Sequence, residues 1–81
     1  MNNINSNARE VLKLIPSVDC IVLDCYKNCN IPFHYSVLKK IIKEEIKSIK
    51  LEIIDGNIIT DVKDCLYKSI YLCIEKYSKF S

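Results

Sequence analysis

The chain of 81 residues contains a single glycine and only two prolines. A phosphate-binding loop requires several closely spaced glycines, so this composition excludes that class of nucleotide site. The chain also lacks the roughly 18 consecutive apolar residues that a membrane-spanning helix requires. Its N-terminus shows no basic region followed by an apolar run, so we expect no signal peptide, no membrane association and a cytoplasmic location.

The five cysteines form an odd number, which argues against a closed disulfide framework and favours reduced thiols. The net charge of +2 is too small to indicate a nucleic-acid-binding protein by itself. Hydrophobic residues make up 49% of the chain, enough for one small core. We therefore expect a single domain over residues 8–81, preceded by a polar, frayed segment over 1–7.

Signals for strands and hairpins are poor, whereas helical periodicity is strong. The pattern predicts helices at about 8–15, 18–27, 33–54 and 61–79. The expected fold is thus all-α: a small compact domain of about four helices, the last two forming an antiparallel hairpin.

Capping residues define the first two predicted helices. Asn7 or Ser6 can cap the first, and Pro16 ends it. Ser17 can cap the second, with Asp19 in the first turn, where the helix dipole favours a carboxylate.

The third and fourth predicted helices have similar signals at their ends. Pro32 suits the start of the third, and Gly56 suits a left-handed cap after it. Thr60 is the expected cap of the fourth helix, and Asp61 and Asp64 are expected in its first turn.

Both long helices have an apolar face. At about 100° per residue, the core face of the third helix comprises Leu38, Ile41, Ile42, Ile46, Ile49 and Ile53. The corresponding face of the fourth comprises Val62, Cys65, Leu66, Ser69, Ile70, Cys73, Tyr77 and Phe80, in which the two cysteines act as small hydrophobic residues. Tyr67, Tyr71 and Glu75 are expected on its other face.

Cysteines and the one histidine cluster as Cys20-x4-Cys25-x3-Cys29-x4-His34. Cys20 and Cys25 would point about 140° apart on one helix, so the four side chains do not suit a tetrahedral zinc site. Ordinary reduced thiols are the favoured interpretation. An adventitious site at Cys25, Cys29 and His34 stays open. No orienting third group accompanies a Cys/His pair, so we expect no catalytic residue and no cofactor in this chain.

A basic stripe follows the third helix. Five lysines lie within an arc of about 100° beside the apolar face: Lys39, Lys40, Lys43, Lys47 and Lys50. Five lysines and two glutamates give residues 39–50 a local charge of +3, more than the whole chain carries. Such a row can follow a phosphate backbone, and it can also be an ordinary solvated face. Arg9 and Lys13, near the first helix, are candidates to extend it.

Residues 14–22, LIPSVDCIV, resemble the "L-P-S-V-D-x-L-L" opening of bacterial selenocysteine synthase, the L-seryl-tRNA(Sec) selenium transferase. Lys43 and Lys50 match basic positions of the long helix in that family. The sequence departs from the family at 33–36, FHYS, where the family often has a Gly-Arg pair, and in having lysines where the family helix has arginines. Lysine keeps the charge but lacks the planar fork that binds phosphate in bidentate fashion.

The resemblance implies a function that the residues alone do not show. In this family the N-terminal helical domain recognises selenocysteine tRNA, chiefly through its D-arm. A neighbouring domain, in a large homo-oligomer, carries the pyridoxal phosphate that converts the seryl group with selenophosphate. By this resemblance the chain is a monomeric tRNA-binding domain, inactive alone, without the catalytic domain of the parent.

Two alternatives remain at this point. One is a helical protein-interaction module that uses Tyr67 and Tyr71 as an exposed face. The other is a small zinc-stapled domain built on the Cys/His cluster.

Overall fold

A computed structural model describes residues 6–56 and 61–80, and this part of the chain is helical with no strand. The all-α prediction is therefore confirmed. The helices are α1 (Ser6–Leu12), α2 (Val18–Asn28), α3 (Tyr35–Ile54) and α4 (Val62–Phe80).

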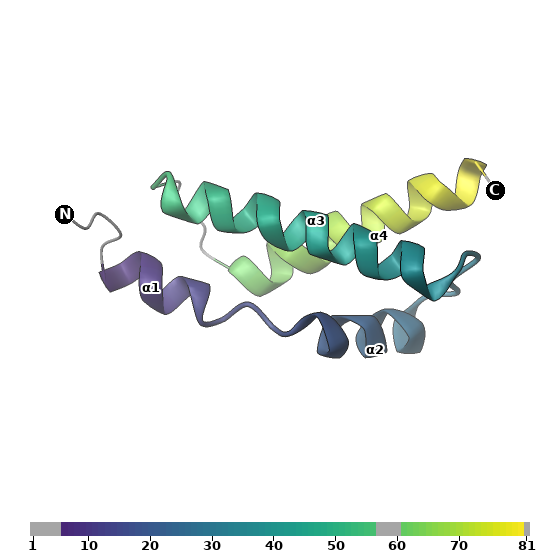
Figure 1. Cartoon of the computed structure of the whole chain (residues 1–81), viewed down its shortest axis with the longest axis horizontal. Coiled ribbons are helices and arrows are strands. Elements are labelled where there is room, and N and C mark those ends of the chain that lie inside the picture. Colours follow the sequence, from purple (N-terminus) through teal and green to yellow (C-terminus); the bar gives the residue numbers. More distant parts are fainter. Residues whose placement is uncertain (1–5, 57–60, 81) are drawn as a thin grey trace.

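The two long helices, α3 and α4, run antiparallel and cross each other (Figure 1). The shorter α1 and α2 follow one another along one side of this hairpin, with α1 beside the C-terminal half of α3. The molecule is elongated, with extents of 46 × 21 × 20 Å. No helix within the described ranges is both long and apolar enough to cross a bilayer.

One apolar core joins α2, α3 and α4, and α1 packs on its edge. The buried face of α3 is the predicted one, because six apolar residues recur at helical spacing over its whole length. No polar or charged residue is buried in the described part of the chain. The buried residues are Ile21, Val22, Cys25, Leu38, Ile41, Ile42, Ile46, Ile49, Ile53, Val62, Leu66, Ile70 and Ile74.

The predicted face of α4 was partly wrong. Its buried residues are Val62, Leu66, Ile70 and Ile74, an i,i+4 row that turns about 40° around the helix at each step. A helix that crosses its partner at an angle buries such a drifting row rather than a fixed face. Cys65 is consequently exposed, and Cys73 is only half-buried.

The remaining predicted members of that face also differ. Tyr77 is half exposed, and the side chain of Phe80 lies outside the described part of the chain. Tyr67 and Tyr71 were expected on the opposite, solvent-facing side, but both are half-buried and pack against the core.

Two predicted caps are confirmed. The Ser17 side chain accepts a hydrogen bond of 3.2 Å from the Cys20 N–H at the start of α2, and Asp19 lies in the first turn. Gly56 has φ +90° directly after α3, in the left-handed region that other residues avoid.

Other helix ends differ by a few residues from the prediction. The first helix begins at Ser6, so Ser6 and Asn7 are inside it rather than capping it. It ends at Leu12, where the chain tightens into i→i+3 hydrogen bonds before Pro16. At the start of α3, His34 is the N-cap, because its Nδ1 accepts the Ser36 N–H at 3.1 Å.

The fourth helix begins one residue later than expected. Asp61 acts as its N-cap: its side chain accepts from the Asp64 N–H at 3.2 Å, and its carbonyl accepts from the Cys65 N–H. The expected cap, Thr60, lies outside the described residues. Asp64 lies in the first turn, as predicted.

Candidate nucleic-acid interface

The lysine row of α3 (Lys39, Lys40, Lys43, Lys47 and Lys50) is at the surface. Lys39 is half-buried and the other four are exposed. None of them forms an ion pair with any residue that the structure describes; the one ion pair there is Lys13–Glu10. Their positive charge is therefore balanced by solvent ions, which a bound polyanion could replace.

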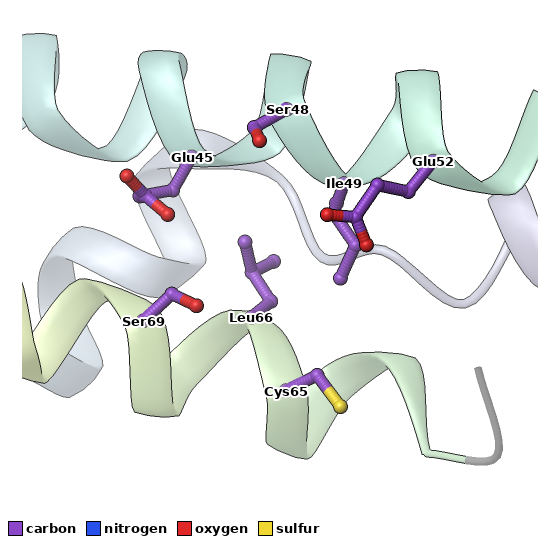
Figure 2. A pocket seen from close by; sticks show the side chains of 7 residues that line it. All are labelled: Glu45, Ser48, Ile49, Glu52, Cys65, Leu66 and Ser69. Carbon is purple, nitrogen blue, oxygen red and sulfur yellow. The ribbon is translucent and has the colours of Figure 1, made fainter. Parts of the chain in front are cut away.

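Two of the three glutamates of α3 lie on the side that faces α4, whereas the third, Glu44, is exposed and lines a hollow together with Lys40 of the row. Glu45 and Glu52 reach from α3 toward α4 and line a shallow groove together with Cys65 and Ser69 (Figure 2). Glu45 also accepts a hydrogen bond of 3.5 Å from the Cys73 thiol. Glu45 and Glu52 therefore place negative charge on the α4 side of α3, while Glu44 is an acidic neighbour of the row at Lys40.

Arg9 and Lys13, the proposed extension of the row, are exposed on and just after α1. The Lys13 Nζ lies 3.5 Å from Glu10 Oε2, and this exposed pair neutralises part of its charge. Because α1 lies beside the C-terminal half of α3 (Figure 1), Arg9 is on a neighbouring element of the same bundle. No interaction joins Arg9 or Lys13 to the α3 lysines within the described residues.

A pair of tyrosines beside the lysine row was not anticipated from the sequence. Tyr26, near the end of α2, and Tyr35, the first residue of α3, stack with ring centroids 6.5 Å apart and planes 11° from parallel. Lys39 Nζ lies 5.4 Å from the centroid of the Tyr35 ring. The i,i+4 spacing of Tyr35 and Lys39 was a usable signal for that contact. The ring pairing depends on the course of the 29–34 connection, which periodicity does not define.

The Cys73 thiol, which lines a second hollow between α3 and α4 with Glu45, is not activated as a nucleophile. It donates a hydrogen bond to the Glu45 carboxylate, and both burial and this hydrogen bond raise the pKa of Cys73. A reactive thiol needs the opposite, a lowered pKa beside a positive group. The geometry therefore gives Cys73 a structural rather than a nucleophilic role.

The cysteine and histidine cluster is not assembled into a metal centre. Within residues 6–56 and 61–80, no three Cys, His, Asp or Glu side chains are grouped so that they could hold a metal ion. Cys20 is exposed whereas Cys25 is fully buried, in keeping with the divergent directions expected for them on one helix. All five cysteines are free thiols, and His34 serves as a helix cap.

Burial makes Cys25 an inert thiol. Removal from water raises its pKa from the ordinary 9.0 to about 11, with smaller contributions from Cys29 and Asp24. At neutral pH the thiol is protonated and packs as a small hydrophobic residue.

Tyr67 and Tyr71, the expected protein-binding face, are instead used inside the domain. Their rings pack edge to face with centroids 6.0 Å apart, and the Tyr67 hydroxyl donates a hydrogen bond to Asp24 on α2. Burial is the larger cause, and this hydrogen bond the next, of the raised pKa of Tyr67. This contact ties α4 to α2, so a large part of the surface of both tyrosines is used in packing within the domain.

The segment that resembles selenocysteine synthase has a clear local role. Pro16 lies in the connection after α1, and Ser17 and Asp19 start α2. A serine cap followed by an acidic residue would start many helices, so the segment's structure is explained without the family. Comparisons with known families, curated proteins and solved structures gave no match to this chain.

Proposed function

We propose that this domain binds RNA through the lysine row of α3, and that its target is a tRNA, with selenocysteine tRNA as the candidate that the LIPSVD resemblance suggests. One observation carries the proposal: five lysines share one side of a helix, and none forms an ion pair with a carboxylate within the described residues. Charges of alternating sign along a helix face are typical of side chains that pair with one another, and the five positions of the row lack that alternation.

The row suits a phosphate backbone in length and in chemistry. From Lys39 to Lys50 the helix rises about 16 Å, at about 1.5 Å per residue. Lysines contact phosphates as flexible point charges, which supports affinity more than base selection. Paired RNA is read mainly through its phosphates and 2′-hydroxyls, so the fit of the helical surface to a stem would provide the discrimination.

In the role that the resemblance suggests, the domain would hold a seryl-tRNA while a separate pyridoxal-phosphate enzyme domain carries out the chemistry. The residues of this chain would contribute binding and orientation only. The lysine row, which is at the surface of the part of the chain that the structure describes, supports this binding role.

Charge reversal on the row tests the proposal. Lys43→Glu with Lys47→Glu should weaken tRNA binding by more than tenfold, because two favourable contacts become repulsive, and should lower the slope of log affinity against log salt by about two. Neither side chain packs in the core, so helicity should be unchanged.

The matched control is Lys68→Glu with Lys76→Glu on α4, which changes the net charge by the same amount. These two lysines are exposed and do not belong to the row. If both double variants weaken binding equally, attraction is general and the α3 row is not the interface.

A further inference from the structure

The stacked pair Tyr26–Tyr35 differs from the two other aromatic pairs found among the described residues. Phe33 is half-buried against the core and packs on Tyr77 at 5.8 Å, and Tyr67 and Tyr71 are both half-buried. Each of those pairs has at least one ring packed against the core, although Tyr77 itself is 50% exposed. In the Tyr26–Tyr35 pair, by contrast, neither ring packs against the core, and the residues keep 46% and 43% of their surface exposed. Packing of the core therefore does not account for the position of these two rings.

The arrangement of the pair leaves aromatic surface uncovered. A centroid separation of 6.5 Å with nearly parallel planes is at the wide end of offset stacking, where the two rings overlap little. The two rings thus cover little of each other, and the surface of the Tyr35 ring is shared with the Lys39 ammonium group, which lies over it. The two rings come from different helices, which hold them in nearly parallel orientation.

A lysine of the row lies directly against this aromatic surface. Lys39 lies over the Tyr35 ring and is also the first member of the lysine row. Lys27 is exposed next to Tyr26. The row and the tyrosine pair are therefore continuous, with phosphate-binding groups along α3 and flat rings at its N-terminal end.

From this juxtaposition we infer that Tyr26 and Tyr35 form a stacking site for an unpaired base of the RNA whose backbone lies along the lysine row. The inference rests on the proposed function and adds a preference: the domain should favour a stem that carries a single-stranded loop over a fully paired duplex. Aromatic rings beside a basic track are the usual means of binding unpaired bases, and stacking accepts any base.

The first test compares two RNA probes, a hairpin with an unpaired loop and a blunt duplex of the same stem. Tyr26→Leu with Tyr35→Leu should weaken hairpin binding about tenfold or more for each stacked base that is lost. Binding of the duplex and the salt slope for either probe should stay unchanged, because no phosphate contact is removed. Tyr26→Phe with Tyr35→Phe keeps both π-faces and should bind the hairpin as the unmodified chain does.

The outcomes separate the two proposals. If the leucine variant binds the hairpin like the unmodified chain, the stacking site is wrong while the lysine interface stands. If it loses hairpin and duplex binding equally, the tyrosines only shape the basic surface, which also overturns the inference. Thermal melting of each variant confirms that any loss is not unfolding.

A second measurement decides the inference even if the lysine row binds no structured RNA. A short single-stranded oligonucleotide is added to the unmodified chain while the tyrosine ring protons are followed by NMR. Upfield shifts at Tyr26 and Tyr35, but not at Tyr67, are expected from stacking. Absence of shifts at the pair overturns the inference, and shifts there with no binding of tRNA would overturn only the proposed function.

Discussion

The hydrogen bond from Tyr67 on α4 to the carboxylate of Asp24 on α2 provides a sharp test of how the bundle is held together. The two residues are 43 positions apart in the chain. Both are half-buried, and the Tyr67 ring also contacts Tyr71 and lies under the Lys63 ammonium group. We predict that the hydrogen bond between the Tyr67 hydroxyl and the Asp24 carboxylate contributes measurably to the free energy of unfolding of this small domain.

The magnitude follows from burial. A hydrogen bond to a charged group contributes about 1.5–3 kcal/mol when it is well shielded. Because Asp24 retains contact with water and is rehydrated when the hydroxyl is removed, we expect a value around the lower limit of that range, about 1–2 kcal/mol. For a domain of this size, such a loss would lower the melting temperature by about 4–8 °C per kcal/mol.

The assay is a double-mutant cycle in urea, with unfolding followed by circular dichroism. Tyr67→Phe keeps the ring and its aromatic neighbours, Asp24→Ala removes the acceptor, and the double variant closes the cycle. The matched control is Tyr77→Phe, whose hydroxyl has no hydrogen-bond partner among the described residues and whose loss should change stability by less than about 0.5 kcal/mol. A coupling energy near zero between Tyr67 and Asp24 would refute the reasoning.

Three further predictions concern local features. Because burial raises the pKa of Cys25 from 9.0 to about 11, folding favours the neutral thiol. The free energy of unfolding should therefore be insensitive to this group below pH 9 and should fall by up to about 3 kcal/mol between pH 9 and pH 11. Urea titration at several pH values should show a smaller decline for Cys25→Ala. Gly56→Ala should lower the free energy of unfolding by about 1–2 kcal/mol through backbone strain at φ +90° alone, because no atom lies within 4 Å of the added Cβ. Gly56→Asn should lower it by less, because asparagine adopts this backbone conformation more readily. Ser17→Ala should lower the free energy of unfolding by about 1 kcal/mol, because it removes the N-cap of α2. The Ser17→Asp variant keeps a capping side chain and should have a melting temperature close to that of the unmodified chain.

The sequence was sufficient to predict the number of helices, their order and the buried face of α3. That helix repeats its apolar residues at constant phase for 20 residues, so one wheel describes it. The cap at Ser17 and the turn at Gly56 were equally predictable from the sequence, because each depends on the chemistry of a single residue.

The buried face of α4 was only partly predictable. Apolar and weakly polar residues surround much of this helix, and its crossing with α3 selects the drifting row that ends at Ile74. Its contact with α2 then turns Tyr67 and Tyr71 inward. A helical wheel contains neither the crossing angle nor the position of a third helix.

One part of the candidate interface was predictable from the sequence and another part was not. The lysine row lies on one helix and follows from spacing alone, whereas the Tyr26–Tyr35 pair joins two helices through a connection of irregular backbone. His34 illustrates the same limit, since its capping role depends on the path of that connection.

The most direct test of the account is binding of the 81-residue chain to selenocysteine tRNA and to serine tRNA, each at two salt concentrations. We predict tighter binding to selenocysteine tRNA, weakened at the higher salt with a slope that reflects several lysine–phosphate contacts. Equal, salt-sensitive binding to both would leave a basic RNA-binding face without the proposed target. Failure to bind either tRNA at low salt would contradict the central claim that the lysine row of α3 is an RNA-binding surface.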